Sequence, residues 1–342
     1  MLYLWKLFLC VTAAAAIRPS KAVCVLLLLS VVAAFDFRVE PDWVSWKGCI
    51  SHHEAKLLVQ AKQTYLVDSA GSKVSIKASI DLSKSIEELL ISNEGVHTVN
   101  NELLVTWQEL EDICNEKRKG CYSIYHDGTK PFLVSTLSKT TGIPASLVAP
   151  LEKAGAPTMV LGGFTMHRII DTTPYDDTRA KIDSIQIFKG SKVLDTCCGL
   201  GYTAIEAATR GGVVTTVEFD PASLEICCHN PWSKPLFDNS LPITIKCGDA
   251  AEVIKTMPSQ SYNVIVHDPP ARALTRTNIY GSKFYEDCRR VLANNGVLFH
   301  YIGNPDSKES GRLYAGITKR LLEAGFTNVR KAPRAFGLVA SN

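Results

Sequence analysis

The chain has little of what marks a disordered, fibrous or disulfide-built protein. Of its 342 residues only 22 are glycine and 16 are proline, while 46% are hydrophobic, which excludes a collagen-like or low-complexity chain. Its 11 cysteines are too sparse for a disulfide scaffold. The adjacent pairs Cys197-Cys198 and Cys227-Cys228 lack the spacing of zinc and redox motifs. We therefore expect reduced, buried thiols and no metal site.

The chain also has no large excess of charge of one sign, and it has no internal repeats. The 37 basic residues exceed the 34 acidic ones by only three, so the net charge by itself predicts no strong attraction to nucleic acid. No segment repeats with the period of a solenoid. A chain of this length is expected to form about two globular domains with a substantial core.

The first 37 residues differ in composition from the rest. Two apolar runs, residues 7–16 and 22–35, are separated by the charged segment 18–21, and each is shorter than the ~20 residues that span a bilayer. Val32-Ala33-Ala34 is typical of a signal-peptide cleavage site. We interpret residues 1–37 as a hydrophobic leader, either a signal or transit peptide or a membrane anchor. The location is then an organelle, with the plastid as one candidate, or the endomembrane system.

Residues 38–175 divide into two parts by pattern. Residues 38–69 show no clear periodicity and are expected to form an exposed linker. Over residues 70–175, short apolar runs alternate with polar residues and turns, which predicts strands. Thr106 is a candidate N-cap of a short helix, and Asp127-Gly128 is a candidate hairpin turn. We predict a small β-rich N-terminal domain over residues 70–175.

Residues 176–342 alternate between strand and helix patterns. The clearest apolar strands are residues 192–194, 213–219, 243–246, 264–267 and 297–302. This alternation predicts an α/β domain with a doubly wound, mostly parallel sheet that carries helices on both faces. Ligands of such sheets bind in the loops after the carboxyl ends of the strands.

Carboxylates follow four predicted strands in chain order: Asp195, Glu218, Asp249 and Asp268. Asp195 begins a loop through Gly199 and Gly201, where glycine allows the backbone to approach a ligand closely. Glu218 is placed to accept both hydroxyls of a ribose. Asp249 is placed to receive an adenine amine.

These residues, together with Asp268-Pro269-Pro270, resemble the motifs of class I S-adenosylmethionine-dependent methyltransferases, which have a Rossmann-like fold. A nicotinamide dehydrogenase would have a third glycine where this chain has Ala204, and it has no use for Asp-Pro-Pro. The resemblance implies S-adenosyl-L-methionine as the cofactor. The residues that it implies for cofactor binding are Asp195, Thr196, Cys197, Gly199, Gly201, Glu218, Asp249 and Ala250. Cys197 stands where the family has its first glycine.

Further motifs resemble a more specific branch, best known in archaea and plants, with members similar to ribosomal RNA cytosine-N4 methyltransferases. These motifs lie at residues 163–168, 176–181, 195–205, 230–233 and 299–305. In that branch Asp-Pro-Pro continues as Arg-Phe-Ser, whereas this chain has Ala271, Arg272 and Ala273. This difference from the branch affects the expected shape of the acceptor pocket and therefore the substrate.

The resemblance implies that Asp268, Pro269 and Pro270 are the catalytic residues of an amino-methyltransferase. Asp268 and the Pro269 carbonyl would accept the two N–H groups of a planar amine. His267 and His300 are candidates for moving a proton. His167 and Arg168 are candidates for contact with a phosphate or the cofactor.

The function that we favour is methyl transfer to an exocyclic amine of a nucleobase in RNA, above all cytosine N4 of ribosomal RNA. Three alternatives stay open: a small-molecule N-methyltransferase, an aminopropyltransferase-like enzyme and a non-catalytic scaffold of the same fold. The expected partner is RNA or a small-molecule amine, with membrane contact only through residues 1–37. We infer no obligate protein partner.

Overall fold

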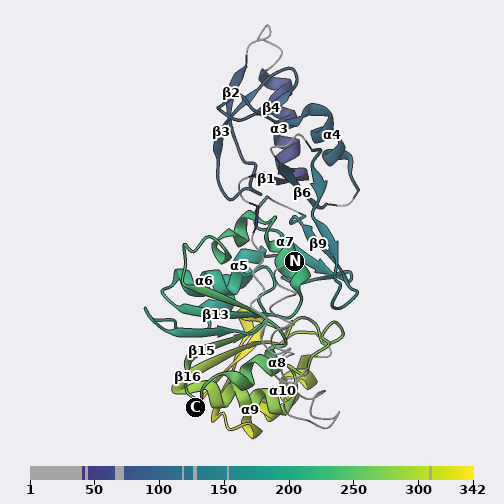
Figure 1. Cartoon of the computed structure of the whole chain (residues 1–342). Coiled ribbons are helices and arrows are strands. Elements are labelled where there is room, and N and C mark those ends of the chain that lie inside the picture. Colours follow the sequence, from purple (N-terminus) through teal and green to yellow (C-terminus); the bar gives the residue numbers. More distant parts are fainter. Residues whose placement is uncertain are drawn as a thin grey trace, which may run out of the picture. The chain divides into compact units, whose positions relative to one another are not determined.

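The computed structural model describes residues 41–42, 45–65, 73–117, 119–125, 129–151, 154–307 and 310–342 (Figure 1). The leader predicted over residues 1–37 and the predicted Asp127-Gly128 turn lie outside these ranges. The chain from Phe37 to Asn342 forms one compact unit. Within the described ranges, no helix has both the length and the apolar character that a membrane span requires.

A seven-stranded sheet carries the site, with the strand order β14-β13-β12-β15-β16-β18-β17. Its strands are β12 (Lys192–Asp195), β13 (Val213–Glu218), β14 (Ile243–Cys247), β15 (Tyr262–His267), β16 (Leu292–Tyr301), β17 (Asn328–Ala332) and β18 (Gly337–Ser341). The first five of these run parallel to one another. Only β18 runs opposite to the other six strands, because it is antiparallel to both β16 and β17. The predicted mostly parallel sheet is confirmed.

Helices cover both faces of this sheet (Figure 1) because neighbouring strand residues point to opposite sides. On one face Val193 packs with residues of α5 (Pro174–Asp183), α6 (Tyr202–Thr209) and α7 (Pro221–Cys227). On the other face Leu194 packs with residues of α8 (Ala250–Val253), α9 (Ser282–Val291) and α10 (Ser310–Glu323). The two apolar layers fix the sheet between the helices and leave its strand ends for the site.

Three small antiparallel sheets precede this arrangement. Their strands are β1 (Trp46–Ser51), β2 (Val74–Ala78), β3 (Glu87–Ile91), β4 (Gly95–His97), β5 (Leu103–Thr106), β6 (Cys121–Tyr125), β7 (Phe132–Leu133), β8 (Ser135–Leu137), β9 (Pro144–Val148), β10 (Thr158–Leu161) and β11 (Phe164–Thr165). Thr106 caps α4 (Trp107–Asn115) through a capping box with Glu109, which confirms the predicted helix start. A separate domain over residues 70–175 stays a prediction.

The prediction of an exposed linker over residues 38–69 is wrong for residues 46–65, which the structure describes as a strand and a helix. Residues 46–51 form β1, and His52–Tyr65 form the helix α3. Ile50, Ala55 and Leu58 are buried in an apolar cluster with strands β2 to β5 and helix α4. These few apolar residues are spaced among polar ones, so the burial of one helix face does not show as a clear periodicity.

Candidate active site

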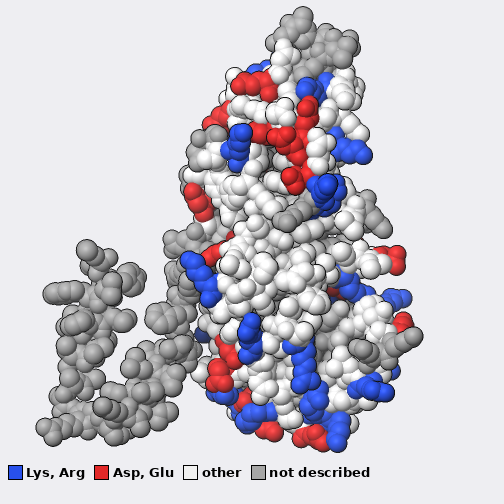
Figure 2. Space-filling view, turned by 90° about the vertical axis from the view of Figure 1, so that its right-hand side faces the viewer, with Lys and Arg blue, Asp and Glu red and all other residues white. Residues whose placement is uncertain are grey.

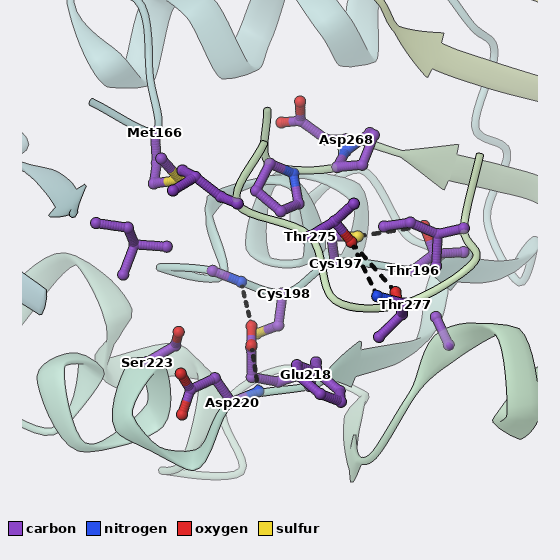
Figure 3. A pocket seen from close by; sticks show the side chains of 18 of the residues that line it. Met166, Thr196, Cys197, Cys198, Glu218, Asp220, Ser223, Asp268, Thr275 and Thr277 are labelled. Carbon is purple, nitrogen blue, oxygen red and sulfur yellow. Dashed lines mark hydrogen bonds between the residues drawn. The ribbon is translucent and has the colours of Figure 1, made fainter. Parts of the chain in front are cut away.

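A cavity opens at the carboxyl ends of β12, β13, β14 and β15, as the parallel topology predicts. Its lining includes Thr196 after β12, Glu218 at the end of β13, Ala250 at the start of α8, and Asp268 after β15. Figure 3 shows Glu218 and Asp268 on opposite sides of the cavity. The antiparallel region supplies a further wall, which includes Met159 of β10. The two carboxylates are therefore placed to act on different parts of one bound molecule.

The loop between β12 and α6 has the backbone that its glycines allow. Gly199 and Gly201 have φ angles of 54° and 76°, in the left-handed region that favours glycine. Gly199 lines the cavity, and a Cβ atom added there would meet no other atom within 4 Å. Cys197 is not among the described residues with a positive φ. The backbone therefore accommodates a cysteine where the family has its first glycine.

Gly201 has a packing role at the start of α6 rather than a place in the cavity lining. A Cβ atom added to it would lie 2.3 Å from Cδ1 of Leu236. We expect Gly201→Ala to lower the free energy of unfolding by about 2 kcal/mol or more, from left-handed strain and this overlap. Gly311→Ala is the matched control, since nothing lies within 4 Å of an added Cβ atom. Chemical denaturation should show little change for the control, and equal losses would contradict this account of the loop.

Glu218 ends β13 with its carboxylate almost completely buried, at 8% exposure. Its Oε2 accepts a hydrogen bond from the Gly199 N–H at 2.8 Å, and its Oε1 accepts one from the Asp220 N–H at 2.9 Å. These bonds fix the carboxylate at the cavity wall (Figure 3). Each oxygen keeps a second lone pair, so Glu218 can still accept hydroxyl groups from a ligand. Burial raises the pKa of Glu218 to about 7.

Asp195 lies at the end of β12 and is fully buried. Its Oδ2 accepts a hydrogen bond from the Thr216 hydroxyl at 2.8 Å. Its Oδ1 is buried and has no hydrogen-bond partner among the described residues. Burial raises the pKa of Asp195 to about 8, although the Thr216 hydroxyl opposes this rise. A buried carboxylate with an unpaired oxygen is costly unless a cation or donor arrives.

These features fit S-adenosylmethionine. Glu218 can accept its ribose hydroxyls, and Gly199 leaves space for close approach. Asp195 is fully buried and does not line the cavity, so its contact with the ammonium group stays a prediction. Another residue predicted to bind the cofactor lies outside the cavity lining. Asp249 does not line the cavity, although Gly248 and Ala250 do. Its Oδ1 accepts the Ala251 N–H at the start of α8. The adenine contact of Asp249 stays a prediction.

The raised pKa values of Glu218 and Asp195 predict pH-dependent binding. The ionised carboxylates are the better acceptors for hydroxyl and ammonium groups. We expect the affinity for S-adenosylhomocysteine, measured by calorimetry, to rise at least about tenfold from about pH 6 to about pH 8.5. The free energy of unfolding should fall over the same interval, because the native state retains protons that the unfolded state has released. An affinity that is flat or falls would contradict the assignment, and Asp195→Asn should make the rise smaller because only Glu218 still titrates in this range.

Asp268 follows β15 and joins a buried cluster of charges. Its Oδ2 accepts a hydrogen bond from Lys181 Nζ at 2.6 Å, and the same ammonium lies 3.0 Å from Oδ2 of Asp177. Arg168 forms an ion pair with the other oxygen of Asp177. The side chains of Lys181 and Asp177 are 1% and 0% exposed. Burial alone would lower the pKa of Lys181, but Asp268 and Asp177 raise it well above its usual value. The four charges balance.

The other oxygens at this turn are not engaged. Asp268 Oδ1 and the Pro269 carbonyl accept no hydrogen bond from a described residue, and both residues line the cavity. The Pro270 carbonyl accepts a hydrogen bond from the Tyr280 hydroxyl at 2.8 Å. Asp268-Pro269-Pro270 is therefore a rigid turn that presents two acceptors. The roles predicted for Asp268 and Pro269 stay predictions, whereas the Pro270 carbonyl is committed to the fold.

The roles predicted for His267 and His300 need correction. Both side chains are fully buried, and neither lines the cavity. His267 Nδ1 is 2.7 Å from the Thr196 hydroxyl, and His300 Nε2 is 3.0 Å from the Tyr285 hydroxyl. Burial lowers the pKa of His300 to about 3 and lowers that of His267 strongly. They are neutral packing residues beneath the site, because apolar surroundings disfavour the imidazolium.

His167 and Arg168 differ in their relation to this cavity. His167 lines it, and burial lowers the pKa of its ring to about 3, so it is neutral. Arg168 does not line this cavity, because its guanidinium is held by Asp177 and by the Arg334 carbonyl at 2.8 Å. No group of residues that could bind a metal ion occurs in the part of the chain that the structure describes.

The sequence interpretation missed the role of Lys181. Asp177 and Lys181 are one turn apart on α5, and such a pair is typical of a solvated helix surface. Here both side chains face the sheet, and Lys181 reaches the strand-end carboxylate Asp268. The signals in the sequence are that the pair lies within the motif at residues 176–181 and on a short helix directly before the sheet.

Known proteins are similar in sequence and fold to the part of the chain that contains the seven-stranded sheet. Residues 177–322 match the family model described as "Methyltransferase small domain". An uncharacterized protein of Methanocaldococcus jannaschii is 45% identical over 185 residues, which cover 54% of this chain and 63% of that protein.

Two shorter matches are to proteins whose names give different reactions. Polyamine aminopropyltransferase 2 of Streptomyces coelicolor is 31% identical over 124 residues, covering 34% of this chain and 22% of that protein. The tRNA (uracil-5-)-methyltransferase homolog A of Homo sapiens is 29% identical over 113 residues, covering 32% of this chain and 17% of that protein. The chain thus spans less than two thirds of each of these relatives.

A crystal structure of spermidine synthase in complex with the transition-state analogue AdoDATO has a TM-score of 0.50 and 18% identity. It covers 60% of this chain and 71% of that one. At this identity the likeness shows the fold alone. Residues 177–322 thus resemble a methyltransferase small domain, and the α/β fold of the chain is similar to that of the spermidine synthase structure.

Proposed function

We propose that the chain is an S-adenosylmethionine-dependent methyltransferase that acts on an exocyclic amine of a nucleobase in RNA, with cytosine N4 of ribosomal RNA as the favoured atom. The observation that carries this proposal is the Asp268-Pro269-Pro270 turn, with two unengaged acceptors in the cavity that also contains Glu218. When bound, S-adenosylmethionine supplies a methyl group on a positively charged sulfur.

The residues of the turn are suited to a neutral planar amine. Asp268 Oδ1 and the Pro269 carbonyl can accept its two N–H groups, which turns the nitrogen lone pair out of conjugation. Lys181 holds Asp268 in place through Oδ2 at 2.6 Å. Transfer of this kind depends on positioning and charge stabilisation more than on a strong base. A base in a duplex would have to be unpaired or flipped to reach Asp268.

A cationic polyamine is the main rival acceptor, given the likeness to aminopropyltransferases. The charges of the cavity disfavour it. The carboxylates that line the cavity are Glu218, Asp220 and Asp268, and Glu218 is assigned to the cofactor. The charge of Asp268 is offset by Lys181. A polycation needs a surplus of acidic groups at its site, and little surplus remains here.

The test uses the purified full chain with two pairs of substrates. One reaction contains total RNA and S-adenosylmethionine with a deuterated methyl group; the other contains putrescine and decarboxylated S-adenosylmethionine. We expect a labelled methylnucleoside, identified by mass spectrometry, and no aminopropyl product. A reaction with Asp268→Ala is the blank. Formation of an aminopropylated amine without any labelled nucleoside would overturn the proposal.

A further inference from the structure

A second cavity adjoins the first. The two share four lining residues, Met166, His167, Pro269 and Pro270. The charged residues in the second cavity are Arg168, Arg272, Arg320 and Asp171. The net charge of its lining is therefore positive. The charged residues that line the first cavity are Glu218, Asp220, Asp268 and Arg276, so the net charge there is negative. A molecule whose reacting end lies at Asp268 would extend past the two prolines into basic surroundings.

The three arginines differ in their partners. Arg168 is paired with Asp177, and its guanidinium lies 4.1 Å from the centre of the Phe336 ring. In the part of the chain that the structure describes, neither Arg272 nor Arg320 forms an ion pair with a carboxylate. Arg272 is exposed. The Nε atom of Arg320 is buried and has no hydrogen-bond partner among the described residues. Among the described residues, no carboxylate therefore offsets the positive charge of Arg272 or Arg320, and both charges can attract an anion.

Apolar and aromatic surface lies beside these arginines. Phe164 of β11 is 51% exposed and Ile170 is 81% exposed, although both line the second cavity. Tyr280 and Tyr301 are further rings in its lining. Proteins that bind single-stranded nucleic acids stack the bases on exposed aromatic rings and contact the phosphates with neighbouring guanidinium groups. An inorganic anion alone would have no use for the rings.

We propose that the second cavity binds the RNA strand next to the target nucleotide, with Arg272 and Arg320 on a phosphodiester group and Phe164 stacked on a neighbouring base. The planar guanidinium group matches the geometry of phosphate oxygens. On the face shown in Figure 2, basic and acidic side chains are interspersed around a broad uncharged area. Recognition on that face therefore has no large basic surface to rely on. This inference rests on the proposed function for the choice of RNA.

The experiment measures binding of a five-nucleotide oligoribocytidylate by fluorescence anisotropy, with S-adenosylhomocysteine present. Arg272→Gln and Arg320→Gln should each weaken binding about fivefold or more and reduce the slope of log affinity against log salt by about one. An oligomer with uncharged methylphosphonate linkages should bind all variants alike. Lys319→Gln is the matched control, because Lys319 lies next to Arg320 on α10, is 77% exposed and pairs with Glu323.

The affinity for S-adenosylmethionine should be the same in all these variants. The proposed phosphate site would be wrong if both arginine variants bound the oligomer as tightly as the wild type, or if Lys319→Gln lost as much affinity as they do. This holds whatever reaction the protein catalyses. If the arginine variants lose binding while Asp268→Ala still methylates RNA, the phosphate site stands and the amine chemistry at Asp268 is wrong. The two proposals therefore fail by different results.

Discussion

Replacing Asp268 by alanine is expected to lower the rate of methyl transfer to RNA at least about 100-fold, while the affinity for S-adenosylmethionine stays within about twofold of wild type. The carboxylate lies across the cavity from Glu218 (Figure 3), so its loss leaves the cofactor contacts in place. Its attraction to the amine strengthens as positive charge develops on the nitrogen, and the loss therefore falls on turnover. Single-turnover transfer and calorimetry measure the two quantities.

The control for this variant must separate chemistry from folding. Asp268→Ala removes one of the two carboxylates around the buried Lys181 ammonium, which destabilises the native state. Asp268→Asn keeps the shape and an oxygen that accepts hydrogen bonds, so it should retain part of the activity. Denaturation of both variants shows whether each is folded under the assay conditions. A folded Asp268→Ala variant with the wild-type rate would exclude amine methylation at this turn.

Replacing Glu218 by alanine is expected to weaken S-adenosylmethionine binding by about 2–3 kcal/mol, or about 30- to 150-fold. The variant loses the acceptor for two ribose hydroxyls, and it also releases the Gly199 N–H that the carboxylate holds at 2.8 Å. Both changes act on the cofactor end of the cavity. Titration calorimetry with the full chain gives the affinity directly.

Glu252→Ala is the matched control for Glu218→Ala. Glu252 is an acidic residue of α8 whose side chain is 59% exposed and pairs with Lys255, and it does not line the cavity. Its replacement should leave the affinity unchanged. Unaltered binding by Glu218→Ala, or an equal loss in both variants, would remove Glu218 from the cofactor site.

The sheet and the strand-end residues could be predicted because both depend on local pattern. Each parallel strand is a short apolar run, and Glu218 and Asp268 lie where such runs end. Parallel strands bring these ends to one edge of the sheet. Gly199 and Gly201 were recognisable because a tight loop between a strand and a helix requires left-handed backbone angles.

The remaining parts of the site depend on contacts between distant segments. Lys181 reaches Asp268 across 87 residues of sequence, and nothing in the local pattern distinguishes it from a solvated lysine. The histidines show the opposite error. His267 ends β15 and His300 is the next-to-last residue of β16, but the alternation of the strands directs both side chains into the packed interior. Asp249 follows a strand as predicted, yet its carboxylate caps a helix.

The most direct test of the central claim is nucleoside mass spectrometry of RNA from cells that lack the protein. We predict that one methylated nucleoside, N4-methylcytidine above others, is lost or depleted at its sites. The wild-type chain should restore it, and the Asp268→Ala chain should not. An unchanged set of methylated nucleosides in these cells, or full restoration by Asp268→Ala, would contradict the account.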